Sequence, residues 1–162
     1  MTFRTFIVIA FFATALLSCR HEPETVDLDN QLFDEIVNPA GWQWYQNRDT
    51  LQAAAPSPHG SFTLRFNQTA VTVLDSTLEL PVGSVFPEGS VIVKEAIKPG
   101  STDILVVMKK SPSGDYAAGG WQWAEYYRNG EVFYSVSKSG DACLSCHQSE
   151  PQRDLTKTFD LH

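Results

Sequence analysis

The feature that constrains this chain most strongly is the sequence Cys-Leu-Ser-Cys-His at residues 143–147. A C-x-x-C-H spacing is the signature of covalent attachment of a c-type haem. In such a site the two thiols bond to one edge of the porphyrin, and the adjacent imidazole binds the iron as proximal ligand. The motif therefore predicts that Cys143 and Cys146 hold one haem c covalently and that His147 is the iron ligand.

Two other interpretations of the paired cysteines stay open. A structural zinc site needs four ligands, and the other histidines, His21, His59 and His162, each stand alone in the sequence. A thioredoxin-like redox pair is typical of a βαβ pattern, and none surrounds residue 143. Both observations favour haem attachment. His59 is a candidate sixth iron ligand, although a single histidine before a glycine is more typical of a loop.

Residues 1–18 have the pattern of a secretory signal peptide. Arg4 supplies a positive charge, and the uncharged apolar stretch at residues 6–17 follows it. That stretch is too short to span a bilayer, which requires about 20 apolar residues. It leads into Leu-Leu-Ser-Cys at residues 16–19, which resembles the bacterial lipoprotein processing site. The resemblance implies lipidation of Cys19; an ordinary cleavage site with a chance cysteine is the alternative.

The expected lipid anchor determines where the protein should reside. Several acyl chains together anchor a protein firmly where one binds only marginally. Arg20 follows Cys19, at the position where an aspartate would favour the inner membrane, so we expect the periplasmic face of the bacterial outer membrane. All three cysteines then have a role, and none is left to mispair in an oxidising periplasm.

The charge of the mature chain limits its partners. Without the signal peptide, 144 residues remain, with 11 basic and 19 acidic side chains and a net charge of −8. This length allows one domain with a hydrophobic core. So acidic a chain is repelled by phosphate backbones, and we expect no nucleic-acid partner. The charge is compatible with a redox partner protein that presents a positive patch.

The mature chain divides into a tether and one domain. We assign residues 19–29 to a polar membrane tether and residues 30–162 to a single haem-binding domain. Apolar side chains at positions 32, 33, 36 and 37 share one helical face and predict a short helix from Asn30 that ends at Asn38-Pro39.

The rest of the domain is rich in strand patterns. The predicted strands are residues 61–66, 91–97, 104–108, 121–127 and 131–136. Residues 104–108 are apolar on both faces and should be central, with Lys109 and Lys110 at the solvated end. Asn129-Gly130 predicts a hairpin. The expected fold is α+β and mainly β: an antiparallel sheet of four to five strands, a short N-terminal helix, and a short C-terminal helix carrying the haem motif.

Several motifs follow one another in a recognisable order. They are His59-Gly60, the sequence Phe-Pro-Glu-Gly-Ser-Val-Ile-Val-Lys-Glu at residues 86–95, Val107-Met108-Lys109, Gly120-Trp121, and the late haem motif with Asp154 and Phe159 behind it. In this order they resemble the cytochrome P-460 family. The resemblance implies a mainly β fold, often a homodimer, with histidine below the haem iron and an open site above. The related cytochromes c′-beta share that fold.

The resemblance also singles out a lysine. Hydroxylamine-oxidising members carry a covalent bond from a lysine side chain to the porphyrin edge, and the motif places that lysine at Lys94. Strand alternation puts Lys94 on one face with Ile92 and Ala96, where an unpaired ammonium is costly unless it is neutralised or bonded. A lysine that reaches solvent from an edge strand is the alternative.

One departure from the family pattern leaves the activity open. Oxidising members have an acidic residue over the open iron face, from the strand before the Met-Lys segment, whereas residues 104–108 contain no carboxylate. Oxidation of a bound amine needs a proton acceptor within reach, and Asp103, Asp115 and Glu125 are the candidates if the fold brings one over the iron.

We therefore hold two hypotheses. The first is an enzyme, a haem oxidoreductase acting on hydroxylamine, nitric oxide or a related small nitrogen species bound at the iron. The second is a non-enzymatic haem protein that binds a diatomic gas or transfers electrons. In the second, the distal wall would be apolar and would come from Leu105, Val107, Trp121 or Trp123. A lipoprotein scaffold that never attaches haem is a third, simpler alternative.

Overall fold

The computed structural model describes residues 25–52, 57–97 and 103–157. The predicted signal peptide and Cys19 lie outside the described residues, as do His21, Phe159 and His162. Within the described ranges, no helix has the length and apolar character needed to cross a membrane.

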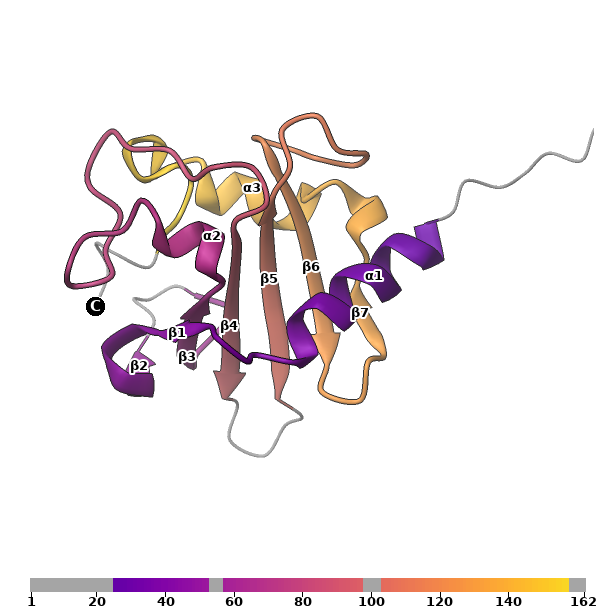
Figure 1. Ribbon diagram of the computed structural model, residues 1–162. Helices are drawn as coiled ribbons and strands as arrows, with labels where there is room; N and C mark the ends of the chain where they lie inside the picture. Colours follow the sequence, from indigo (N-terminus) through magenta and orange to yellow (C-terminus); the bar gives the residue numbers. More distant parts are fainter. Residues whose placement is uncertain (1–24, 53–56, 98–102, 158–162) are drawn as a thin grey trace, which may run out of the picture.

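The described residues form one antiparallel sheet of seven strands at the centre of the fold (Figure 1). Its order is β1-β3-β4-β5-β6-β7, with β2 also paired to β3. The strands are β1 (Gln43–Trp44), β2 (Leu51–Gln52), β3 (Ser61–Phe66), β4 (Val91–Ile97), β5 (Ile104–Lys110), β6 (Trp121–Tyr127) and β7 (Val132–Tyr134). The predicted fold class is confirmed. The sheet has more strands than expected because β1 and β2 are two residues long, too short to show a period-2 pattern.

Within the described ranges, six helical elements join or cover the strands. They are α1 (Thr25–Val37), η1 (Tyr45–Arg48), α2 (Gln68–Val71), η2 (Val136–Lys138), α3 (Asp141–His147) and η3 (Pro151–Arg153).

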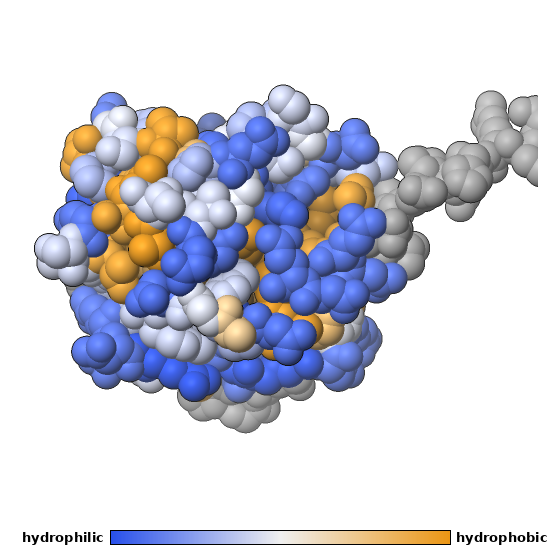
Figure 2. Space-filling view, in the orientation of Figure 1, coloured by the Kyte–Doolittle hydropathy of each residue, from blue (hydrophilic) through white to orange (hydrophobic). Residues whose placement is uncertain are grey.

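Apolar side chains are exposed over the loop between α2 and β4, where Val82 is 67% exposed and Val85 61% (Figure 2).

Helix α1 lies across one face of the sheet (Figure 1) and begins earlier than expected. It starts at Thr25, so the last five residues of the predicted tether are helical. Asp29 explains the difference. Its buried carboxylate accepts hydrogen bonds from the Ser135 hydroxyl at 2.6 Å and the Val136 N–H at 2.9 Å. These bonds fix the first half of the helix to η2, which only the folded chain brings near.

Side chains alternate between the two faces of the central strands and form two cores. On the α1 face, Val93, Leu105 and Tyr126 pack together with Leu32 and Ile36 of the helix. On the opposite face, side chains from β3 to β6 pack against α3 and the C-terminal segment; they include Phe62, Leu64, Phe66, Ile92, Met108 and Trp123. The predicted central position of residues 104–108 is confirmed, since β5 lies between β4 and β6 and contributes to both cores.

Candidate functional site

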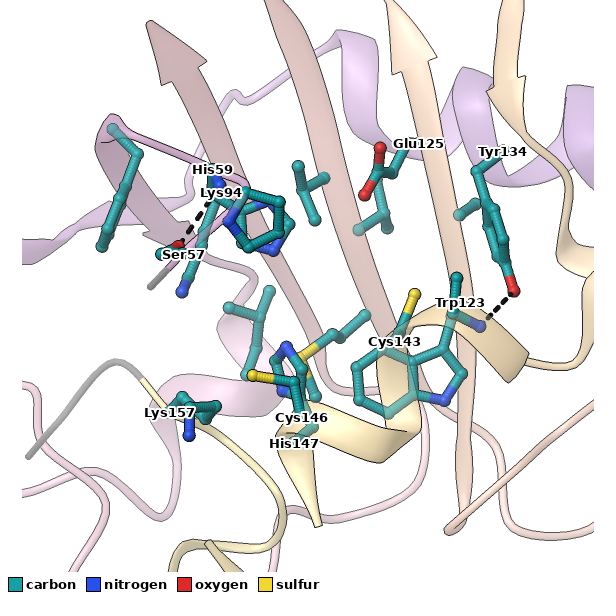
Figure 3. Close-up of a pocket in the computed structure, with 18 of the residues that line it drawn as sticks. Ser57, His59, Lys94, Trp123, Glu125, Tyr134, Cys143, Cys146, His147 and Lys157 are labelled. Carbon is teal, nitrogen blue, oxygen red and sulfur yellow. Dashed lines mark hydrogen bonds between the residues drawn. The ribbon is translucent and has the colours of Figure 1, made fainter. Parts of the chain in front are cut away.

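A cavity of about 320 Å³ opens on the sheet face that α3 covers (Figure 3). Its walls come from β3, β4, β5, β6, β7, α3 and the segments before β3 and after η3. The lining includes Phe62, Ile92, Lys94, Val106, Met108, Trp123, Glu125, Tyr134, Cys143, Cys146, His147 and Thr156. Concave, mostly apolar sites with a few convergent polar groups are where proteins bind small molecules and cofactors.

Helix α3 brings the three residues of the predicted haem motif to this cavity. Cys143, Cys146 and His147 all line it, because residues three and four apart lie on one side of a helix. Both thiols are free, and His147 is buried. The helix begins hard against the sheet: Gly140 has a φ of +63°, and a Cβ there would lie 2.3 Å from Cδ1 of Trp123. The Trp123 ring in turn meets the His147 ring edge to face, with centroids 4.8 Å apart.

The surroundings of His147 suit a metal ligand. Its Nδ1 lies 2.7 Å from the Leu155 carbonyl oxygen. A carbonyl only accepts, so Nδ1 carries the proton and Nε2 keeps its lone pair, the tautomer that coordination through Nε2 requires. Burial is the main cause that lowers the pKa of His147 to about 4. The imidazole is therefore neutral near pH 7.

The Leu155 carbonyl is held in place by a buried ion pair. Asp154 and Leu155 both have left-handed backbone conformations, with φ of 50° and 66°. Lys110 Nζ lies 2.7 Å from Oδ1 of Asp154, and the Phe86 N–H donates to Oδ2 at 3.0 Å. The expectation that Lys110 marks a solvated strand end is wrong, since the residue is only 6% exposed. The buried ammonium is tolerated because it pairs with the Asp154 carboxylate. The strand pattern could not show this pairing, because Asp154 lies 44 residues further along the chain.

Lys94 projects from β4 into the same cavity, as its predicted strand face requires. Its Nζ lies 4.5 Å from the centre of the Phe62 ring. Among the described residues no carboxylate lies within ion-pairing distance of it. Burial is the main cause that lowers the pKa of Lys94 to about 8. The Lys94 side chain is thus close to the haem motif, and its ammonium group loses a proton more readily than that of an exposed lysine.

The structure also selects among the three candidate carboxylates. Glu125 lines the cavity, while Asp103 faces Arg128 at 3.5 Å and Asp115 is not part of the lining. Glu125 stands on β6 directly opposite Val106 of β5. Residues opposite each other on neighbouring strands share a face with Cβ atoms about 4.5–5.5 Å apart. The carboxylate missing from residues 104–108 is therefore supplied one strand away.

The predicted apolar wall is partly wrong. Trp123 lines the cavity, but Leu105 and Val107 belong to the core on the α1 face, although Val107 also borders the cavity, and Trp121 is buried beside Phe86. The strand alternation that puts Leu105 on the far face turns Val106 and Met108 toward the cavity. His59 also lines it, and its backbone N–H donates to the Ser57 hydroxyl at 3.2 Å.

Sequence patterns did not assign several lining residues to the site. Among them, Val106, Tyr134 and Thr156 belong to none of the motifs. For Tyr134, a strand pattern alone could not show that its hydroxyl bonds to Asp141 at the start of α3.

These residues fit a covalently held haem. The two free thiols of Cys143 and Cys146 and the neutral imidazole of His147 lie within about one turn of α3 and beside apolar walls. The buried Thr156 hydroxyl has no hydrogen-bond partner among the described residues, as expected of a polar group that lines a cofactor cavity. The alternative zinc interpretation gains no support, because the described residues contain no cluster of three histidine, cysteine or acidic side chains arranged to hold a metal ion.

The comparison with known families agrees with the order of motifs. The sequence model described as Cytochrome P460 matches residues 39–158, a range that includes every lining residue named above. No curated protein matches the chain.

We expect Asp154→Ala to lower the free energy of unfolding by about 3–5 kcal/mol, because it leaves the buried Lys110 ammonium without a partner. Urea unfolding of the mature protein measures the change. The double variant Lys110→Met/Asp154→Ala should lose less than Asp154→Ala alone, since the orphaned charge is removed. Asp34→Ala on the exposed side of α1 is the control and should stay within about 0.5 kcal/mol. Equal losses in Asp34→Ala and Asp154→Ala would contradict the role of the ion pair.

Proposed function

This chain belongs to the cytochrome P460 family, and on that basis we propose that it is a membrane-anchored periplasmic c-type cytochrome with one haem and an open axial site. We propose redox chemistry on a small nitrogen species such as hydroxylamine or nitric oxide. The observation that carries the proposal is the single cavity that gathers the C-x-x-C-H side chains, Lys94 and Glu125.

The residues of α3 would hold the haem. Cys143 and Cys146 would form its thioether bonds, and His147 would bind the iron through Nε2. A bound haem supplies one-electron chemistry and a coordination position for a small ligand. The Leu155 carbonyl keeps the imidazole in one orientation and tautomer, and such a hydrogen bond also raises ligand basicity. Lys110 and Asp154 support this arrangement by fixing the turn that presents Leu155.

Glu125 is the group best placed to accept protons. Oxidation of a hydroxylamine releases protons, and a side chain within reach of the substrate must take them. Among the described residues that line the cavity, Glu125 is the acidic one, and it would pass protons outward because the residue is partly exposed. Lys94 would contribute through the predicted bond to the porphyrin edge, which would also remove an uncompensated charge from an apolar wall.

A second function is favoured by a different observation. Val106 occupies the strand where oxidising members of the family place their acidic residue, and Ile92, Met108 and Phe62 extend the apolar lining. Such a wall suits an uncharged diatomic ligand, as in the related cytochromes c′-beta. The protein would then bind a gas or transfer electrons without catalysis, and Glu125 would be dispensable.

We propose that the mature protein is tethered to the outer membrane by lipid on Cys19 and faces the periplasm. The apolar stretch before Cys19 and Arg20 after it support this placement. A redox partner with a positive patch would complement the net charge of −8. A homodimer, implied by the family resemblance, stays a prediction that light scattering of the purified protein can check.

Mass spectrometry tests haem attachment and the Lys94 cross-link independently of each other. We expect the intact mature protein to carry one haem, and Cys143→Ser/Cys146→Ser to carry none by thioether bonds. Tryptic peptides should contain Lys94 joined to the haem peptide, whereas Lys94→Arg should keep the haem and lose the joined peptide. Lys138→Arg is the control. An unmodified Lys94 peptide would contradict the cross-link, and an intact mass without haem would support the scaffold alternative.

The role of Glu125 distinguishes the two functions. We expect hydroxylamine-dependent reduction of an electron acceptor to fall by about 10²–10⁴-fold in Glu125→Gln, the usual contribution of a positioned acid or base. Glu131→Gln, an exposed carboxylate of the same hairpin, should leave the rate unchanged. Carbon monoxide binding should persist in both variants, since the iron site is intact. Nitric oxide binding without any hydroxylamine oxidation by the parent protein would instead support the non-enzymatic function.

The anchor is tested by fractionation. We expect the parent protein to sediment with outer membranes and Cys19→Ser to be released into the soluble periplasm, because the acyl chains are lost. Ser18→Ala, which keeps the cysteine, should still sediment. Membrane association of Cys19→Ser would rule out the lipid anchor.

A further inference from the structure

A second cavity, of about 370 Å³, lies on the α1 face of the sheet, away from the predicted haem site. It is lined by Val37, Pro39, Trp44, Arg48, Arg65, Glu95, Leu105 and Arg128. The three arginines come from η1, β3 and the turn between β6 and β7, so only the folded chain gathers them. Arg65 and Glu95 face this side because their strand neighbours Leu64 and Lys94 face the other.

The arginines of this cavity outnumber the carboxylates that neutralise them. All three share Glu95, at 3.1 Å from Arg128, 3.3 Å from Arg65 and 3.7 Å from Arg48. Asp103 adds one further contact, 3.5 Å from Arg128. Within the described part of the chain, three guanidinium groups therefore meet two carboxylates, in a protein whose mature net charge is −8. The surplus positive charge is local and faces a cavity.

Arg65 is the buried member of this arginine cluster and is incompletely paired. The residue is 2% exposed. Its Nη2 donates to the Ile36 carbonyl at 2.8 Å and its Nε forms the ion pair with Glu95 at 3.3 Å, while Nη1 has no hydrogen-bond partner among the described residues. Burying unsatisfied donors of a charged group is costly, and burial is the main cause that lowers the pKa of Arg65. A ligand that accepted a hydrogen bond from Nη1 would remove part of that cost.

Two tryptophans hold the guanidinium groups in place. Cζ of Arg65 lies 4.6 Å from the centre of the Trp42 ring, and Cζ of Arg48 lies 4.2 Å from that of Trp44. Cations stacked on aromatic rings in this way are fixed and partly shielded from water. Arg48 and Arg128 are 59% and 48% exposed, so the cavity can be reached from solvent.

We propose that this second cavity binds a small oxyanion, a carboxylate or an inorganic phosphate. Planar guanidinium forks match the oxygen geometry of both ligands and form short, charge-assisted hydrogen bonds with them. The anion would accept from Nη1 of Arg65 and would also contact the exposed guanidinium groups of Arg48 and Arg128. Since the sheet separates the two cavities, the anion would not compete for the haem iron.

Calorimetric titration of the isolated mature protein at constant ionic strength tests this, with inorganic phosphate and acetate as separate probes. We expect one site per chain for at least one probe, and the probe that binds more tightly identifies the ligand class. Arg48→Ala and Arg128→Ala should each weaken binding at least tenfold. Lys138→Ala, which removes the same charge from an exposed position outside the cavity, should leave the affinity unchanged.

Arg48→Lys separates charge from geometry, because lysine keeps the charge and loses the fork; its affinity should fall between those of the parent and Arg48→Ala. The haem absorption spectrum should not change on titration. Absence of binding by both probes would overturn the proposal, as would equal affinities in the parent, Arg48→Ala and Arg128→Ala. A phosphate-dependent change in the haem spectrum would place the anion at the iron and overturn it as well.

Discussion

The register of the central strands determines what each face of this protein can do. Lys94, Val106 and Glu125 form one row across β4, β5 and β6, because Lys94 pairs with Val106 and Val106 pairs with Glu125. The next row, Glu95, Leu105 and Tyr126, faces α1. A shift of one residue in any strand would exchange the two faces. The haem-side lysine and carboxylate and the arginine cluster therefore depend on one set of backbone hydrogen bonds.

The row of Lys94, Val106 and Glu125 explains how the cavity has an acidic side chain although residues 104–108 of β5 contain none. Cross-strand neighbours on one face are only about 4.5–5.5 Å apart at Cβ. Glu125 on β6 therefore lies beside Val106 of β5 and provides a carboxylate in the cavity although residues 104–108 contain none. The apolar Val106 then leaves more of the wall uncharged, which is why gas binding and proton-coupled oxidation are both chemically reasonable for this site.

The proximal side depends on the chain after the haem motif. His147 is oriented by the Leu155 carbonyl, the left-handed turn at Asp154 and Leu155 is fixed by Lys110, and Gly140 allows α3 to start against Trp123. Each of these contacts joins segments that are distant in sequence or need a special backbone conformation. Together they connect His147, the proposed iron ligand, to β5 and β6, so this side of the site is anchored to the sheet and is not an isolated helix.

The sequence by itself determined the local features: the C-x-x-C-H motif, the long strands, the hairpin at Asn129-Gly130 and the family to which the order of motifs belongs. These follow from periodicity and short spacing. Only the tertiary structure decided that Lys110 is buried, that Asp29 bonds to Ser135 and Val136, that Glu125 rather than Asp103 reaches the cavity, and that Leu105 and Trp121 do not. The physical reason is that each of these outcomes depends on pairing between segments far apart in the chain, such as Lys110 with Asp154 or Asp29 with Val136, and on which strand face meets which layer, neither of which leaves a local pattern.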